Sequence, residues 1–150
     1  MIIRELARED VVTVYLDDSI LDVADVLRAA GVGSAVVLDA NDDPLGIVTD
    51  RDLVVYGQQF VDSLAETAVN EVLSLTAFSV DPESDLTDLT AQMREEGVRR
   101  VPVTDDGDLV GIVTLDDIIV HLADELDSQE LTDLAAVIER ESPPREGTDT

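Results

Sequence analysis

Two copies of one polar pair, a threonine followed three residues later by an aspartate, are the residues in this sequence best suited to chemistry. Thr49 and Asp52 lie in the run Gly-Ile-Val-Thr-Asp-Arg-Asp, and Thr114 and Asp117 lie in Gly-Ile-Val-Thr-Leu-Asp-Asp, 65 positions later (114 − 49). Packing alone explains why apolar positions recur, but it does not readily explain why two short polar side chains recur together. A carboxylate accepts hydrogen bonds and a hydroxyl donates them, so the pair is suited to a polar ligand. The same spacing also suits the N-terminal cap of a helix, and both interpretations stay open.

The repetition extends far beyond these two pairs. Residues 3–6 match residues 69–72, and Gly31 matches Gly97, at an offset of 66 (97 − 31). One residue is lost in the second copy between positions 39 and 46, inside a polar turn, where a duplicated chain tolerates a change of length. This repetition predicts a first copy at residues 1–60, a connector at 61–76 and a second copy at 77–126. A C-terminal helix at 127–141 and a disordered tail at 142–150 are expected to follow.

Composition limits the class of protein. The chain has 150 residues, of which 45% are hydrophobic, and this is enough for one sizeable core shared by two half-sized repeats. It has no cysteine, which excludes disulfides and thiolate metal sites, and we expect no bound metal. The N-terminus lacks a secretory signal, and no apolar stretch approaches the roughly 20 residues of a membrane helix. We therefore expect a soluble, cytoplasmic protein.

Charge is the second strong signal in the composition. The formal net charge is −26, from 35 acidic and 9 basic residues, and every basic residue is arginine. Such a chain is repelled by nucleic acid and by anionic membranes, so we expect neither as a partner. Its self-repulsion would be screened in concentrated salt, where the Debye length is about 3 Å at 1 M. The lysine-free acidic composition resembles that of haloarchaeal-type proteins, although an acidic protein from an ordinary cytoplasm is the alternative.

Hydrophobic periodicity predicts the same α+β order, strand–helix–strand–strand–helix, in both copies. In the first copy Ser19 offers a helix cap and Gly31 a helix stop, and in the second copy the stop is Gly97. A third helix near the C-terminus either covers the core or seals a dimer contact. In the first copy the expected strands are at 11–15, 34–38 and 45–49, and the expected helices at 20–30 and 51–59. In the second copy the expected strands are at 77–80, 100–104 and 109–114. One helix of the second copy is expected after a cap at 81–84, and the other at 116–126.

These motifs resemble a known family. The second copy has Gly97 followed by an apolar-Pro-Val segment at 101–103 and then Gly-Ile-Val-Thr-x-x-Asp, and the first copy departs from it at Val36, where the pattern has proline. Over residues 1–126 the sequence is similar to a tandem CBS domain pair, also called a Bateman module. The resemblance implies two β-α-β-β-α repeats related by a pseudo-twofold axis, with two clefts that bind AMP, ADP, ATP or S-adenosylmethionine. It also implies sensing rather than catalysis, and a homodimer.

The resemblance assigns roles to the polar pairs. Asp52 and Asp117 would accept hydrogen bonds from the two ribose hydroxyls, and Thr49 and Thr114 would donate to a phosphate oxygen. In the family each cleft combines the Thr-x-x-Asp pair of one copy with the glycine-containing segment of the other. The first pair would then face Arg99 and Arg100, whereas the second would face Gly33 and Ser34, so that phosphate is better neutralised beside the first pair. The further ligand-binding candidates are Arg51, Thr13, Ser79, Val101 and Pro102.

The resulting functional prediction is a regulatory adenine-nucleotide-binding module that passes a ligand-dependent change to an unidentified effector protein. AMP is weakly favoured over ATP, because an acidic protein repels a polyphosphate. The alternative is a structural or interaction module that dimerises without a ligand. An enzyme is not predicted, since His121 is the only histidine and no acid–base or nucleophile arrangement accompanies it.

Overall fold

The computed structural model describes residues 2–73, 78–126 and 129–141. The chain divides into two compact units, which are described separately. The first unit comprises Val11–Phe78 with Asp106–Leu109, and the second comprises Met1–Asp10, Ser79–Asp105 and Val110–Thr150. These units do not coincide with the linear repeats, because the first ten residues belong to the unit that holds the second copy.

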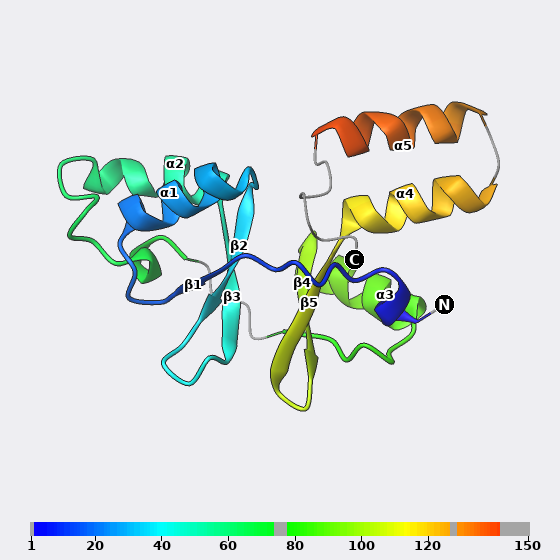
Figure 1. Ribbon diagram of the computed structural model, residues 1–150, viewed down its shortest axis with the longest axis horizontal. Helices are drawn as coiled ribbons and strands as arrows, with labels where there is room; N and C mark the ends of the chain where they lie inside the picture. Colours follow the sequence, from blue (N-terminus) through cyan, green and yellow to red (C-terminus); the bar gives the residue numbers. More distant parts are fainter. Residues whose placement is uncertain (1, 74–77, 127–128, 142–150) are drawn as a thin grey trace. The chain divides into compact units, whose positions relative to one another are not determined.

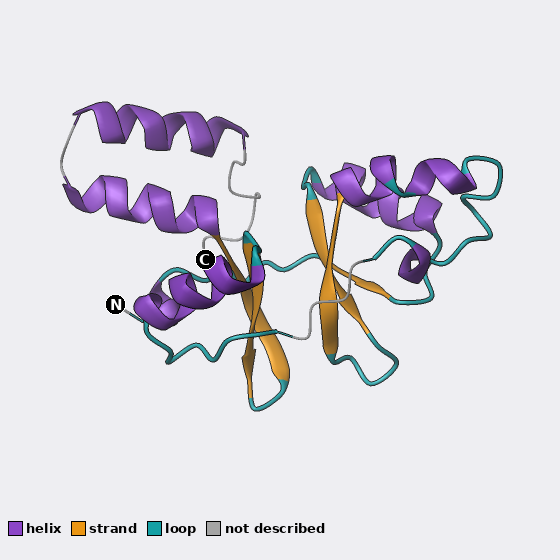
Figure 2. Ribbon diagram, turned by 180° about the vertical axis from the view of Figure 1, so that it is seen from behind, coloured by secondary structure: helices purple, strands orange, loops and turns teal. Residues whose placement is uncertain are grey.

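The first unit is built on a three-stranded sheet of order β1-β2-β3, in which β1 runs parallel to β2 and β2 antiparallel to β3. Two helices, α1 and α2, lie next to each other in both ribbon views (Figures 1 and 2). The elements are β1 (Thr13–Tyr15), α1 (Ile20–Ala30), β2 (Ser34–Leu38), β3 (Pro44–Thr49), α2 (Asp50–Val55), and 3-10 turns η2 (Gly57–Phe60) and η3 (Val69–Glu71).

Helix α1 begins and ends where the sequence predicts. The Ser19 hydroxyl accepts a hydrogen bond from the Asp22 amide at 3.0 Å, which satisfies one of the free donors of the first turn. Gly31 ends the helix with a φ of 66°, a left-handed conformation that glycine adopts at little cost. Between them the apolar positions at helical spacing enter a core whose buried members are Val14, Ile20, Val23, Leu27, Ala35, Val37, Val48, Val69 and Val72.

One feature of the first unit differs from the sequence prediction. The helix expected over 51–59 ends at Val55, and a 3-10 turn follows from Gly57, a residue with poor helix propensity. The connector packs into the first unit. Its Val69 is fully buried, and its amide donates to the Asp18 carbonyl at 2.7 Å. The connector therefore completes the core of the first unit.

The second unit contains a two-stranded sheet, apart from the tip of its hairpin at Asp106–Leu109, with helices beside it. Its elements are η1 (Ile3–Glu5), α3 (Leu86–Glu96), β4 (Arg100–Asp105), β5 (Asp108–Thr114), α4 (Leu115–Leu126) and α5 (Gln129–Glu141). The turn between β4 and β5 is formed by Asp106 and Gly107, both with positive φ (52° and 85°). Two such residues produce the mirror-image turn that matches strand twist, so the predicted hairpin is confirmed.

The strand expected at 77–80 is wrong for its described part. Val80 makes one isolated parallel bridge, to Val103, and no ladder is formed there. Proline explains the short contact, because Pro82, two residues after Val80, and Pro102 on the facing strand have no N–H to donate. The helix cap also lies later than expected, since Asp81 closes a turn by accepting from the Glu83 amide at 2.8 Å. Helix α3 begins only at Leu86.

The N-terminal segment is an integral part of the second unit. Ile3 is fully buried, and its amide donates to the Ser84 carbonyl at 2.9 Å. This mirrors the connector, whose matching residues 69–72 pack into the first unit. The 3-10 turn η1, which precedes the first copy in the sequence, thus belongs to the second unit. The turn η3, which precedes the second copy, belongs to the first unit.

Helices α4 and α5 pack against each other as an antiparallel pair (Figure 1). Ala123 and Ala135 are buried, whereas Leu134 is 58% exposed. The predicted C-terminal helix is thus confirmed over Gln129–Glu141 and contacts a neighbouring helix, while the predicted disorder of 142–150 lies outside the described residues.

Candidate functional site

Each polar pair stands where the last strand of a hairpin runs directly into a helix. Thr49 is the final residue of β3 and the N-cap of α2, and Thr114 is the final residue of β5, immediately before α4. No loop intervenes at either junction. The threonine backbone is therefore fixed by the sheet on one side, and the aspartate by the first helical turn on the other.

In the first unit the pair closes on itself. The Thr49 hydroxyl accepts from the Asp52 amide at 3.1 Å, and the Asp52 Oδ2 accepts from the Thr49 amide at 3.0 Å. This reciprocal arrangement is a capping box, which satisfies two backbone donors at the start of the helix. The Asp52 carboxylate is half-buried and held in a fixed orientation. The capping interpretation of the sequence is therefore correct here, and it leaves the remaining lone pairs of the carboxylate for other donors.

In the second unit the pair has a different partner. The Thr114 hydroxyl again accepts from the Asp117 amide, at 3.1 Å. The Asp117 Oδ1, however, accepts a hydrogen bond from Arg8 Nε at 2.9 Å, and Arg8 Nη2 lies 2.9 Å from the same oxygen in an ion pair. Its Oδ2 is buried and has no hydrogen-bond partner among the described residues. Sequence reasoning missed Arg8, which lies 109 residues from Asp117 and in no repeated motif.

The glycine-containing segment of the first copy lies beside the pair of its own unit. Ser34 is opposite Thr49 in the β2–β3 register, and the Gly33 carbonyl accepts from the Asp50 amide at 2.9 Å. A Cβ on Gly33 would approach an oxygen of Asp50 to 3.3 Å, so the position favours glycine. Thr13 is on β1 opposite Val36, with an exposed side chain.

The two arginines of the second copy likewise lie near the pair of their own unit. Arg99 Nη2 is 3.3 Å from the Asp116 Oδ1, and the Arg99 side chain is exposed whereas that of Asp116 is partly buried. Arg100 is half-buried at the start of β4, where Val101 and Pro102 follow as buried residues. Arg51 is exposed. The expectation that Arg99 and Arg100 face Thr49 concerns residues of different units. It stays a prediction.

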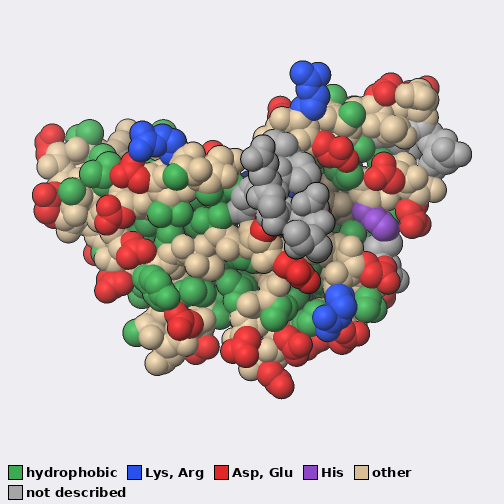
Figure 3. All heavy atoms as spheres, in the orientation of Figure 1, with side chains coloured by type: hydrophobic (Ala, Val, Ile, Leu, Met, Phe, Trp, Pro, Cys, Tyr) green, Lys and Arg blue, Asp and Glu red, His purple; other side chains and the backbone are tan. Residues whose placement is uncertain are grey.

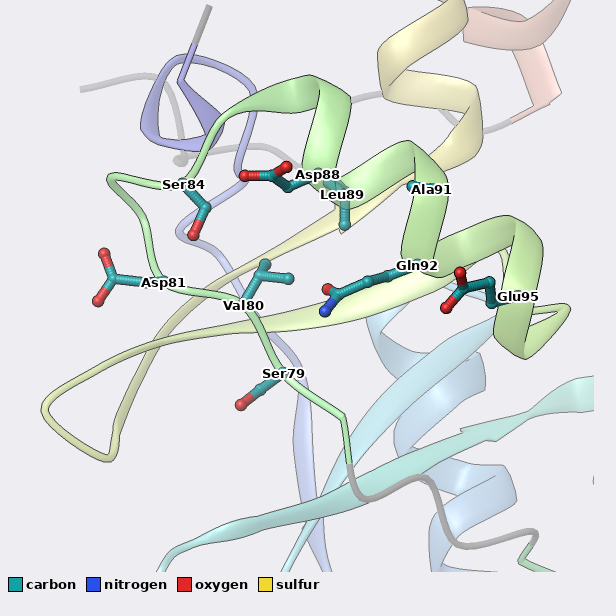
Figure 4. Close-up of a pocket in the computed structure, with 9 residues that line it drawn as sticks. All are labelled: Ser79, Val80, Asp81, Ser84, Asp88, Leu89, Ala91, Gln92 and Glu95. Atoms are coloured by element: carbon teal, nitrogen blue, oxygen red, sulfur yellow. The ribbon is translucent and has the colours of Figure 1, made fainter.

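A pocket of about 420 Å3 lies in the second unit, between α3 and the segment that leads into it (Figure 4). Ser79 is the only predicted ligand residue in its lining, and its hydroxyl is 3.1 Å from that of Thr104. The lining contains three carboxylates and no arginine, an environment that disfavours phosphate. The lining residues are Ser79, Val80, Asp81, Ser84, Asp88, Leu89, Ala91, Gln92 and Glu95.

The surface is strongly acidic, with Asp and Glu side chains spread over the visible face and few arginines among them (Figure 3). His121 is partly buried on α4, and its Nε2 lies 3.5 Å from a Glu125 oxygen. In the described part of the chain no group of three or more His, Asp or Glu side chains is arranged to hold a metal ion. Among those same residues no helix is long and apolar enough to cross a membrane.

Comparison with known proteins identifies the class. The model of the CBS domain family matches the chain twice, over residues 3–58 and 69–124, so the chain belongs to the CBS-domain family and carries two such domains in tandem. The predicted α+β fold and family are thereby confirmed.

The relatives include proteins of archaea and bacteria. An uncharacterized protein of Methanopyrus kandleri is 33% identical over 118 residues, which span 78% of this chain and 60% of that protein. The crystal structure of Hypoxic Response Protein I with two coordinated zinc ions has a TM-score of 0.70 and 28% identity, and covers 81% of this chain and 98% of that one. The CBS domain pair of protein MJ0100, in complex with 5′-methylthioadenosine and S-adenosyl-L-methionine, has a TM-score of 0.70 at 19% identity, covering 83% and 98% respectively. At that identity the last match shows the fold alone.

Proposed function

We propose that this protein is a regulatory module that binds an adenosine-containing ligand through its ribose, with Asp52 as the ribose acceptor. The observation that carries the proposal is the geometry of Asp52 in the first unit. Its carboxylate is half-buried and oriented by the Thr49 amide, which takes one acceptor position on Oδ2. A carboxylate has about four lone-pair directions, so two ribose hydroxyls can still donate to it. Pre-orientation reduces the entropy that binding would otherwise cost.

Membership of the CBS-domain family supports the ligand class, and so does the related fold that was crystallised with two adenosine derivatives. We further propose AMP rather than ATP as the nucleotide, because a net charge of −26 opposes the approach of a polyphosphate. Arg99 and Arg100 are the proposed phosphate partners of the first pair. The competing partner of Arg99 is Asp116, at 3.3 Å. Transmission of the ligand signal to an effector protein is part of the same proposal.

Titration calorimetry in molar KCl tests the proposal, with adenosine, AMP, ATP and S-adenosylmethionine as probes. Asp52→Asn keeps an oxygen for the Thr49 amide but removes the charge, so the fold should survive. Loss of a charge-assisted contact is worth about 1.5–3 kcal/mol, or roughly ten- to hundred-fold in affinity.

The chain offers a matched control for that substitution. Ser19 and Asp22 have the same Ser/Thr-x-x-Asp spacing and the same hydroxyl-to-amide bond at 3.0 Å, at the start of a helix outside both repeated pairs. Asp22→Asn should leave every titration unchanged. If Asp52→Asn binds all four compounds as the parent does, Asp52 is a helix cap only and the proposal fails.

A second candidate function is self-association without a ligand. It is favoured by large hydrophobic side chains exposed at the end of α2, namely Val54 at 73%, Val55 at 41% and the following Tyr56 at 46%. Light scattering coupled to size exclusion, in the same salt, would compare the parent with Val54→Ser. A homodimer that Val54→Ser dissociates, in a protein that binds none of the four compounds, would favour this candidate over the first.

A further inference from the structure

The ion pair between Arg8 and Asp117 is unlike the other ion pairs within the described residues. The Asp117 side chain is 12% exposed and the Arg8 side chain 32%. In the pairs made by Arg4, Arg28 and Arg99 the arginine side chain is at least 56% exposed, and in the pair made by His121 the Glu125 side chain is 63% exposed. Water and salt screen those exposed pairs and leave them with little net effect, whereas a partly buried pair is screened much less. The Arg8 pair is therefore the one that persists in concentrated salt.

The backbone holds Arg8 in this position independently of its side chain. The Arg8 amide donates to the Ile112 carbonyl at 2.8 Å, and the Arg8 carbonyl accepts from the Ile112 amide at 2.9 Å. Gly111, the first residue of the repeated Gly-Ile-Val-Thr run, permits this approach, because a Cβ there would lie 2.8 Å from the Arg8 carbonyl oxygen. These two backbone hydrogen bonds to β5 thus hold Arg8 where its side chain reaches Asp117.

The consequence concerns the acceptor atoms of Asp117. Two ribose hydroxyls are both donors, and a carboxylate that binds them needs accessible lone pairs. Oδ1 already accepts a hydrogen bond from the Arg8 guanidinium and is in an ion pair with it, and Oδ2 is buried. A ribose hydroxyl is a neutral donor, whereas Arg8 brings a positive charge to the Asp117 carboxylate, so a ribose that displaced the guanidinium would break a partly buried ion pair. Asp52 has no such occupant, since no arginine or histidine described in its own unit forms an ion pair with it.

We infer that the Arg8 guanidinium occupies the Asp117 carboxylate and prevents it from binding ribose. Asp52 is then the single ribose acceptor of the two Thr-x-x-Asp pairs. This inference rests on the proposed function, because it assigns that function to one of two matching pairs. It also changes the expectation from the sequence that both pairs recognise ribose alike. The N-terminal segment thereby sets how many ligands the chain takes.

Calorimetry with adenosine in molar KCl provides the main test, because adenosine carries no phosphate that an arginine could attract. We expect the parent to bind a single adenosine per chain, Asp52→Asn to bind it about ten- to hundred-fold more weakly, and Asp117→Asn to match the parent. Arg8→Met keeps the apolar stem and removes the donors, and we expect it to bind a second adenosine. The double variant Arg8→Met/Asp117→Asn should return to one. Arg4→Met is the control, since Arg4 lies in the same segment but pairs with exposed Glu83.

Two results would overturn the inference. One is a parent that binds two adenosines and loses one of them in Asp117→Asn. The other is an Arg8→Met variant that gains no second site and instead binds AMP more weakly than the parent, which would make Arg8 a phosphate ligand.

A ligand-free measurement covers the case in which Arg8→Met does not fold. The Nε–H proton of Arg8 should exchange slowly with solvent in the parent and in Asp52→Asn, and rapidly in Asp117→Ala. Rapid exchange in the parent would overturn the inference without any reference to ligands. A parent that shows slow exchange but binds no adenine compound would instead end the proposed function, so the two failures are distinguishable.

Discussion

The two Thr-x-x-Asp pairs have the same letters and the same place in the fold, yet their carboxylates have different partners. Asp52 bonds back to the Thr49 amide, whereas Asp117 bonds to Arg8. The difference comes from the leading segments that the two units receive. The second unit receives residues 1–10, which carry Arg8, and the first receives the connector. A repeat in a sequence therefore predicts where a side chain stands, while its partner depends on a segment outside the motif.

The hairpins of the two copies differ in a related way. In the second copy the turn is formed by the backbone alone, through Asp106 and Gly107. In the first copy the turn is longer and spans residues 39–43, and Asp42 takes the positive φ of 64° without a glycine beside it. Its carboxylate accepts a bond from the Tyr15 hydroxyl at 2.7 Å. A side-chain contact thus supports the less favourable turn.

Salt should produce the largest effect, because it acts on both copies together. Lowering the salt from 1 M to 0.01 M extends the Debye length from about 3 Å to about 30 Å. With 35 acidic residues against 9 basic ones, repulsion then outweighs the ion pairs, and we expect the melting temperature to fall steadily on dilution. Thermal melts in KCl at several concentrations measure this. A melting temperature that is constant or rises on dilution would contradict the haloarchaeal-type interpretation of the composition.

A substitution at Gly111 should destabilise the second unit alone, because it disturbs only the N-terminal segment that packs there. A Cβ at this position would lie 2.8 Å from the Arg8 carbonyl oxygen and 3.3 Å from the Ala7 Cβ, so the backbone must move. We expect Gly111→Ala to cost about 1–3 kcal/mol of unfolding free energy, as overpacking does. Urea unfolding in molar salt measures it.

Gly57→Ala is the matched control for that substitution. The nearest atom to its added Cβ is 3.9 Å away, an ordinary contact, and Gly57 is buried in the other unit. The substitution should be neutral or slightly stabilising, because alanine restricts the unfolded chain. Equal losses of unfolding free energy in both variants would show that the close approach of the N-terminal segment to Gly111 makes no special demand on that position.

The comparison also shows what sequence reasoning was able to predict. Gly31 and Gly97 both end a helix with a φ of 66°, as their place after an apolar periodic run indicates. Local signals of this kind predicted the order of the helices and hairpins, although α2 ends and α3 begins at other residues than expected. The Arg8–Asp117 pair was not predictable, because an arginine distant in sequence offers no spacing signal and its neighbour is chosen by packing. The strand expected before Asp81 failed for a local reason, the two prolines near Val80, which was visible in the sequence but was outweighed there by β-propensity.

The hydroxyl of Tyr15 should give the smallest effect, and one that is specific to the first hairpin. Its hydrogen bond to Asp42, and then the negative charge of Asp42, raise the pKa of Tyr15 above its ordinary value of about 10. The neutral phenol donates the bond, so its contribution to stability is complete below the ordinary pKa and is lost as the pH rises through the raised one. An ultraviolet titration of Tyr56→Phe, in which Tyr15 is the remaining tyrosine, should show ionisation at a higher pH than in Tyr56→Phe/Asp42→Asn. Asparagine tolerates the left-handed backbone of residue 42, so the second variant removes the charge while the turn is kept. If both titrate at the same pH, Asp42 does not hold the Tyr15 proton, and the first hairpin must be supported in some other way.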